Sequence, residues 1–276
     1  MDIRAIRAEA RQVQATVKGI RLLFLVPILT TICSSLFNFF SPNVFSVQSQ
    51  LQPQTFFSLL FNRSLFPIVI NFVLLIFITS AFSALSEVLR GKQKEVNFQD
   101  SIRLFQGDVF GAVFSTLFVK RFVLFLWSLV ATIGLFLICY SSIVILNLAF
   151  SYPNGIPLAL EGRFGELGNY LIAGLILMFI GLAISIPQIY AYSQVEFILC
   201  DQLKSNHYQG PWAILRASRR MMKGYKGSRF ILDLNFIGWY ILSSFTFGIL
   251  AIYVYPYIYA SHAIFYEHLK AKQANL

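Results

Sequence analysis

Five long runs of apolar residues alternate with shorter polar segments along this chain. Each of the first four is about 20 residues or longer, which is enough for a helix to cross the roughly 30 Å hydrocarbon core of a bilayer. The fifth run, 230–266, would form a helix of about 55 Å at 1.5 Å per residue, too long for one crossing. Gly248 lies near its middle and favours a turn, so we divide this run into two spans.

The pattern therefore predicts an all-α protein: a polytopic transmembrane helical bundle of six spans, forming a single integral membrane domain over residues 1–276. The predicted spans are 22–40, 65–86, 122–150, 170–192, 230–246 and 249–267. Two long loops, 87–121 and 193–229, separate spans two from three and four from five.

Residues 1–21 have the period of an amphipathic helix. Apolar residues recur at steps of three and four, and a basic residue follows most of them; the apolar positions are Ile3, Ile6, Ala10, Val13, Val17 and Ile20. Such a helix is typical of the membrane interface, where its cations reach toward lipid phosphates. Docking to a partner protein is the alternative interpretation.

Both long loops repeat this arrangement. In 87–121 one apolar face predicts an amphipathic helix, and it comprises Phe98, Ile102, Phe105, Val109, Val113 and Leu117. In 193–229 a second such helix begins at Pro211, a residue suited to a first helical turn. Its apolar positions are Ile214, Ala217, Met221 and Tyr225.

Charge fixes the predicted orientation. Of the Lys and Arg residues, five lie in the N-terminal segment, six between spans two and three, seven between spans four and five, and two at the C-terminus. That places 20 of 22 on one side, with Arg63 and Arg163 as the exceptions. Cytosolic loops of membrane proteins carry this excess, so both termini and both long loops are predicted to be cytosolic.

Composition supports a membrane protein, because 57% of residues are hydrophobic and 12% charged, against about 25% charged in soluble domains. The net charge of +10 is explained by anionic lipid headgroups, so no nucleic-acid partner is expected. The residues predicted to contact those headgroups are Arg4, Arg7, Arg11, Lys18, Arg216, Arg219, Arg220 and Lys223.

Polar side chains inside apolar spans are costly and mark candidate sites. Spans four to six carry them at helical spacing, which suggests a polar cavity open to the cytosol. The candidate lining residues are Gln188, Tyr192, Glu196, Asp233, Asn235, Tyr259, His262 and Tyr266. Glu196 is expected at a helix C-terminus, where the helix dipole disfavours an anion.

Structural packing explains the same residues differently. Asp233 lies four residues after Arg229, which suits an ion pair on one helix face. Gly174 and Gly181 would permit close helix contact, and the tyrosines would form part of an aromatic belt. Packing and a ligand or ion site therefore both remain open at this stage.

Catalytic and metal-binding motifs do not emerge. Cys33, Cys139 and Cys200 are scattered among apolar segments without CxxC spacing, and the three histidines lack the HExxH pattern. No G-x-S-x-G motif occurs. We therefore expect no metal, no cofactor and no enzymatic activity.

The C-terminal third resembles a known family. Over roughly 195–268 the relevant residues are Ser218, Met222-Lys223-Gly224-Tyr225-Lys226, Phe230, Leu234, Phe236-Ile237-Gly238-Trp239, Gly248, Pro256-Tyr257 and Phe265-Tyr266. They resemble the uncharacterised bacterial integral-membrane family DUF975, and the rest of the chain matches in hydropathy and layout. The resemblance implies a multi-pass protein of the bacterial plasma membrane, mostly of Gram-positive type, and brings no catalytic residues.

Two main functions compete. The first is a non-enzymatic accessory or scaffold protein, or an envelope-related protein, acting at the inner leaflet. The second is a small-molecule or lipid transporter that uses the polar cavity between spans four to six, and a third, weaker interpretation is an intramembrane enzyme. Expected partners are the bilayer and its anionic headgroups, with other membrane proteins or a second copy in a homo-dimer as alternatives.

Overall fold

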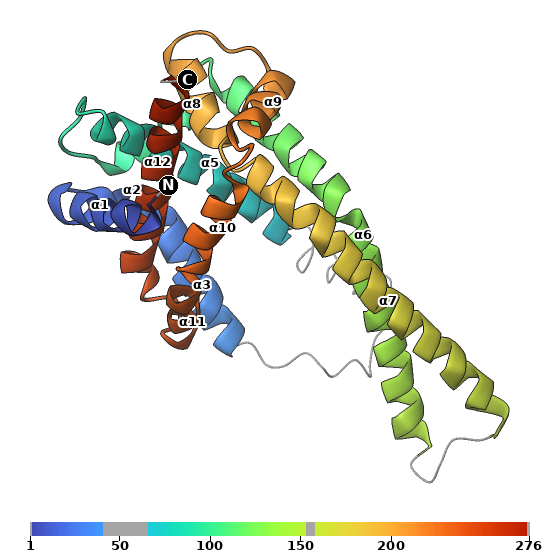
Figure 1. Cartoon of the computed structure of the whole chain (residues 1–276). Coiled ribbons are helices and arrows are strands. Elements are labelled where there is room, and N and C mark those ends of the chain that lie inside the picture. The colour runs from blue at the N-terminus through green and yellow to red at the C-terminus, as the bar shows by residue number, and fades with distance from the viewer. Residues whose placement is uncertain (1, 41–65, 153–157, 275–276) are drawn as a thin grey trace. The chain divides into compact units, whose positions relative to one another are not determined.

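A computed structural model of the protein describes residues 2–40, 66–152 and 158–274 (Figure 1). The regular elements in these residues are helical, with one isolated bridge between Lys18 and Glu95, so the predicted all-α class is confirmed. The chain divides into two compact units, one made of Met1–Leu117 with Gln194–Leu276 and the other of Phe118–Ser193. The hydropathy pattern had indicated a single domain.

The first unit holds most of the helices. It contains α1 (Ile3–Thr16), α2 (Ile20–Leu23), α3 (Leu25–Phe40), α5 (Phe66–Leu89), the 3-10 turns η2 (Phe98–Ser101) and η3 (Arg103–Phe105), the start of α6 (Phe110–Ser151), α8 (Val195–Lys204), α9 (Pro211–Met221), α10 (Lys226–Leu234), α11 (Ile237–Phe245) and α12 (Ala251–Ala274).

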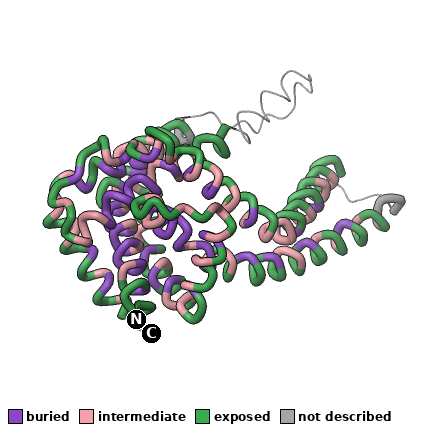
Figure 2. Tube along the Cα trace, turned by 90° about the horizontal axis from the view of Figure 1, so that it is seen from above, coloured by how far each residue is buried: buried purple, intermediate pink, exposed green. Residues whose placement is uncertain are grey.

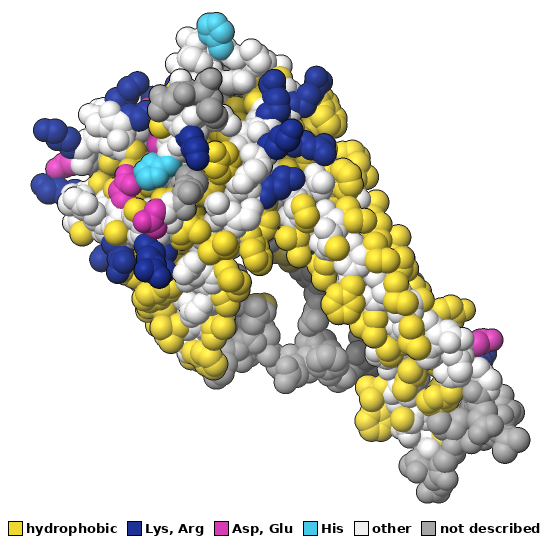
Figure 3. Space-filling model, viewed as in Figure 1, with side chains coloured by type: hydrophobic (Ala, Val, Ile, Leu, Met, Phe, Trp, Pro, Cys, Tyr) yellow, Lys and Arg dark blue, Asp and Glu magenta, His cyan; other side chains and the backbone are white. Residues whose placement is uncertain are grey.

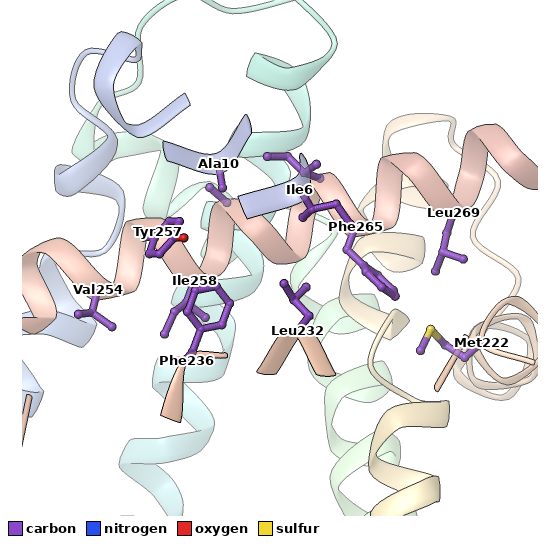
Figure 4. Close-up of a cluster of buried hydrophobic side chains, with 12 residues drawn as sticks. Ile6, Ala10, Met222, Leu232, Phe236, Val254, Tyr257, Ile258, Phe265 and Leu269 are labelled. Atoms are coloured by element: carbon purple, nitrogen blue, oxygen red, sulfur yellow. The ribbon is translucent and has the colours of Figure 1, made fainter. Parts of the chain in front are cut away.

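Helix α12 lies at the centre of the first unit. Its buried side chains, among them Tyr257 and Phe265, contact Leu232 of α10 and residues of α1 in one apolar cluster (Figure 4). Burying large apolar side chains in this way removes them from water or lipid and packs α12 against its neighbours. Figure 2 shows the buried residues gathered in this unit.

The N-terminal amphipathic helix forms as expected, but its apolar face has a protein partner. Asp2 caps α1 by accepting a hydrogen bond from the Arg4 N–H at 2.9 Å, which satisfies one of the free N–H groups at the helix start. Ile6 and Ala10 are fully buried against α12. These two residues therefore contact protein, and not the lipid surface that the pattern indicated.

The amphipathic helix predicted in 87–121 is not formed as one element. Residues 98–105 form η2 and η3, and α6 begins only at Phe110. Asn97 and Asp100 form a capping box that starts η2, and Gly107, with a φ of +77°, ends the irregular stretch. The hydrophobic period there reflects packing of short turns, which a helical pattern alone does not distinguish from a continuous helix.

The second unit is a pair of long helices, the main part of α6 and α7 (Leu158–Ala191). They approach closely at glycines: a Cβ on Gly134 would meet the backbone of Gly174 and Met178, and one on Gly181 would meet Ala131. Ser185 adds a hydrogen bond to the Trp127 carbonyl at 2.8 Å. The prediction that small residues on span four permit close packing is thus confirmed.

Three helical stretches are long and apolar enough to cross a membrane: Phe66–Leu89, Phe110–Ser151 and Gly162–Lys204. They contain the predicted second, third and fourth spans. A shorter apolar helix, Leu25–Phe37, lies in the first predicted span.

The last apolar run is divided as predicted, with additional breaks. Gly248, at a φ of +80°, lies in the turn before α12, as the sequence indicated. The region of the fifth predicted span, however, consists of two helices of 9 residues each, α10 and α11. Each is about 14 Å long at 1.5 Å per residue, so neither crosses a bilayer alone.

Candidate functional site

Two of the predicted cavity residues bind each other. The His262 Nε2 of α12 lies 2.9 Å from the Asp233 Oδ1 of α10. The Arg229 Nε lies 3.5 Å from the other carboxylate oxygen, which confirms the predicted pair at a spacing of four residues. Arg229 is only 5% exposed, and its guanidinium lies 5.6 Å from the centre of the Phe265 ring. A half-buried carboxylate thus sits between an imidazole and a buried guanidinium.

Asn235 connects the same region to α1. Its Oδ1 accepts a hydrogen bond from the Arg7 Nη1 at 3.0 Å, while the Arg7 Nε donates to the Tyr257 hydroxyl at 3.2 Å. The guanidinium also lies 5.9 Å from the Phe236 ring centre. Arg7 was predicted to contact lipid headgroups, but its guanidinium instead joins α1 to α10 and α12.

Glu196 does not stand at a helix C-terminus, as the sequence had suggested. A turn at 192–194 ends α7, and Glu196 lies in the first turn of α8. An anion is favoured at that end of a helix, so the electrostatic argument from the sequence is reversed. The residue is 5% exposed.

Tyr259 lies in an aromatic cluster. Its ring stacks on Phe24 with centroids 4.9 Å apart, and it meets Phe82 and His262 edge-on at 5.5 and 6.0 Å. Offset and edge-to-face contacts of this kind stabilise packed aromatic groups. Tyr259 therefore contributes to the interior packing of the first unit.

Gln188 and Tyr192 belong to the second unit, whereas the other six predicted cavity residues belong to the first. Gln188 is half-buried in α7, and its Oε1 has no hydrogen-bond partner within the described ranges. Tyr192 is buried in the turn that follows α7. The predicted cavity residues therefore fall in both units.

Tyr266 takes part in a charged network that the sequence did not reveal. The Arg90 guanidinium contacts both carboxylate oxygens of Asp201 at 2.7 and 3.0 Å and the Glu267 Oε1 at 2.7 Å. Tyr266 donates to Asp201 at 2.8 Å, and the Lys270 Nζ approaches it at 2.5 Å. Two cations thus face two anions where the end of α5, α8 and α12 meet.

The contacts within this network shift the pKa values of Arg90 and Asp201. Hydrogen bonds to Asp201 raise the pKa of Arg90 above its usual value, against the opposing effect of burial. Burial by itself would raise the pKa of Asp201, but hydrogen bonds from Arg90, Lys270 and Tyr266 hold that pKa below its usual value. The partners are 111 and 177 residues apart in the chain, so no local pattern signals their pairing.

A second group of cations remains on the surface. An open pocket of about 570 Å³ is lined entirely by basic residues of α9, the following turn and the start of α10: Arg216, Arg219, Arg220, Lys223 and Lys226. Figure 3 shows Lys and Arg side chains gathered over α9. The predicted helix at Pro211 is confirmed, with Ile214 and Leu215 buried beneath the basic face.

The remaining predicted headgroup contacts lie on or just after α1. Arg4 and Arg11 are exposed, and Lys18 pairs with Glu95 at 3.2 Å while both side chains stay largely in solvent. Exposed pairs of this kind contribute little to stability, so Lys18 remains free to exchange partners.

Within residues 2–40, 66–152 and 158–274, no three His, Cys, Asp or Glu side chains are grouped so that they could hold a metal ion. His262 and Asp233 lie close enough to exchange a proton.

Comparison with known proteins covers almost the whole chain. Residues 1–273 match the family described as Protein of unknown function (DUF975). The chain belongs to the DUF975 family. The resemblance seen in the C-terminal third therefore extends over the DUF975 protein from α1 through nearly all of α12. No curated protein and no solved structure matches the DUF975 chain.

Proposed function

We propose that this DUF975 protein is a non-enzymatic multi-pass protein of the bacterial plasma membrane that acts at the inner leaflet as an accessory or scaffold protein. In this proposal the chain crosses the bilayer six times and has both termini in the cytosol. The distribution of 20 of its 22 cations over one side supports this orientation.

In this proposal the helices after residue 225 form the fifth and sixth crossings. Because α10 and α11 follow one another, together they provide a broken fifth span, and the 24 residues of α12 provide the sixth. Exposed apolar side chains on α11, including Ile241 and Phe245, suit contact with lipid. Broken helices are tolerated in membranes where neighbouring helices satisfy the freed backbone groups.

One observation carries the scaffold proposal: four polar side chains of the expected cavity already have partners within the fold. Asp233 binds His262, Asn235 binds Arg7, and Tyr266 binds Asp201. Polar side chains that are satisfied within the fold need no solute to compensate for their burial. The basic pocket, in contrast, presents its charges outward, where another molecule can reach them.

Two sets of substitutions test this function in cells that lack the native copy. Arg219→Gln/Arg220→Gln/Lys223→Gln alters the outward basic face, and Asp233→Asn/His262→Gln removes the partly buried ionisable pair (the buried-pair variant). We expect a stoichiometric partner to copurify from native membranes with the wild type and the buried-pair variant, and to be lost with the basic-face variant. Equal membrane levels of all three chains, checked by immunoblotting, are the control.

Transport is the second candidate function, and the partly buried Asp233–His262–Arg229 cluster is the observation that favours it. Ionisable groups within predicted spans are typical of ion and solute pathways. Solute uptake that fails with Asp233→Asn/His262→Gln, and is normal with the basic-face variant, would replace the scaffold proposal by transport. Glu196→Gln tests the remaining acidic residue in the same assay.

A further inference from the structure

The basic pocket is built by a sharp turn between two helices. Helix α9 ends at Met221, and Gly224, at a φ of +83°, reverses the chain before α10 begins at Lys226. Glycine adopts this left-handed conformation without the steric cost of a side chain. The turn places Lys226 beside the basic face of α9, so five cations line one pocket.

Four basic residues elsewhere in the first unit are neutralised by ion pairs, unlike the five that line the pocket. Arg90, Arg103, Lys204 and Lys270 each pair with a carboxylate. Among the residues that the structure describes, none of the five pocket cations forms such an ion pair, and the pocket lining contains no acidic side chain. Positive charges that converge without a counter-charge repel one another until an anion binds between them.

Helix dipoles explain only part of the arrangement. Arg219 and Arg220 occupy the last turn of α9, where cations are favoured without any ligand. Lys226, however, begins α10, and a helix start disfavours a cation. That helix has no side-chain cap and no acidic residue in its first turn. An anion in the pocket would offset both the unsatisfied helix start and the clustered charges.

We propose that this pocket binds a phosphate group carrying more than one negative charge, as a lipid phosphomonoester headgroup or a soluble diphosphate does. Arginine suits this ligand because its planar guanidinium donates two parallel hydrogen bonds to phosphate oxygens. The volume of about 570 Å³ accommodates such a group together with part of the molecule that carries it.

Exposed aromatic residues on both helices place the pocket near a bilayer surface. Trp212 of α9 is 57% exposed, and Phe230, one turn into α10, is 44% exposed. Aromatic side chains of this kind are enriched at the membrane–water boundary. Binding of a lipid phosphate rests on the proposed function, because it requires the pocket to lie at the inner leaflet. Binding of a soluble diphosphate does not require that placement.

Binding to the purified full chain tests the pocket without any partner protein. In one arm, inorganic pyrophosphate is titrated into the detergent-solubilised protein and followed by calorimetry. In the other, native mass spectrometry measures retention of phosphatidic acid, a phosphomonoester, against phosphatidylglycerol, a phosphodiester. We expect pyrophosphate to bind, phosphatidic acid to be retained over phosphatidylglycerol, or both.

The pocket variant is Arg219→Gln/Arg220→Gln/Lys223→Gln, and Arg21→Gln/Lys92→Gln/Lys94→Gln is the matched control, which removes three exposed cations elsewhere and loses the same net charge. We expect the pocket variant to weaken phosphate binding by about tenfold or more, since each charge-assisted bond is worth about that factor. The control should stay within about twofold, because screened charges elsewhere act weakly. Thermal unfolding of each variant in detergent checks that it is folded.

The two arms identify the source of the phosphate. Pyrophosphate binding without selective lipid retention indicates a soluble ligand, and selective retention of phosphatidic acid indicates a lipid; both support the pocket. Equal weakening by the two triple variants, or no binding to the wild type in either arm, would overturn it. These binding measurements do not depend on a copurifying partner protein. The pocket proposal and the scaffold proposal can therefore be contradicted independently of each other.

Discussion

At the scale of single residues, a few side chains decide how distant segments meet. Gly19 lies at a φ of +82° between α1 and α2, where Lys18 and Glu95 form a bridge and the Val96 N–H donates to the Lys18 carbonyl at 3.1 Å. A Cβ on Gly19 would collide with the Val96 carbonyl oxygen. The conformation and the space both require glycine there.

Gly19→Ala should therefore lower the free energy of unfolding by more than about 2 kcal/mol, because the left-handed backbone cost and the collision add together. Gly107→Ala is the matched control: its φ is +77° and nothing lies within 4 Å of the new Cβ. The control should lose only about 1 kcal/mol. Thermal or denaturant unfolding in detergent measures both, and equal losses would show that the contact with Val96 is unimportant.

The Arg90 network predicts a loss of stability in acid. Because the pKa of Asp201 is lower in the folded chain, its contribution is fully present above the ordinary aspartate pKa of about 3.9 and is lost as pH falls through the lower folded pKa. Asp201→Asn should cost about 2 kcal/mol near neutral pH and flatten the acid dependence of the melting temperature. Asp108→Asn, at an exposed position, is the control; an unchanged acid profile in Asp201→Asn would contradict the prediction.

At the scale of helices, two helices approach each other closely where a glycine of one faces the backbone of the other. In the second unit Gly181 of α7 leaves no room for a Cβ against Ala131 of α6, whereas Gly165 of the same helix has nothing within 4 Å. Membrane helices associate through such small-residue contacts because lipid provides no hydrophobic driving force between them. The spacing of glycines along α7 therefore matters at some positions and not at others.

Gly181→Leu should separate α6 from α7 and lower the thermal stability of the purified chain, and Gly165→Leu should leave it nearly unchanged. The loss should be about 2 kcal/mol or more, the usual cost of overpacking a close contact. Engineered disulfide formation between the two helices, for example from cysteines at Ala131 and Ile184, gives a second readout of their approach. Equal stability of the two variants would argue against tight packing at Gly181.

At the scale of the whole molecule, the charge distribution predicts a single orientation. Three exposed positions test it: Lys94 and His207 in the predicted cytosolic loops, and Arg163 on the predicted outer side. Each is replaced singly by cysteine in a chain whose native cysteines, Cys33, Cys139 and Cys200, have been changed to alanine.

A membrane-impermeant thiol reagent should label the cysteine at 163 in intact cells, and should label those at 94 and 207 only after the cells are opened. The reason is the preference of Lys and Arg for the cytosolic side. A tag at each terminus, probed with antibody under the same conditions, checks the even number of crossings. Labelling of position 94 or 207 from outside, or termini on opposite sides, would contradict six spans.

The sequence by itself determined the features that depend on neighbouring residues. Apolar runs predicted the long helices, the 3.6-residue period predicted α1 and α9, and Gly248 predicted the turn before α12. The 3.6-residue period wrongly predicted a continuous helix over 98–105, where the chain forms two 3-10 turns with a similar apolar period. The local pattern also misplaced Glu196, because the turn at 192–194 has no glycine or proline to announce it.

Only the tertiary structure decided which polar groups meet. The pairing of Arg90 with Asp201 and Glu267, and of His262 with Asp233, joins residues far apart in the chain. Folding also covered the apolar face of α1 with α12. Hydropathy records the preference of each segment for lipid or water, whereas a buried charge is stabilised by a partner that distant segments supply.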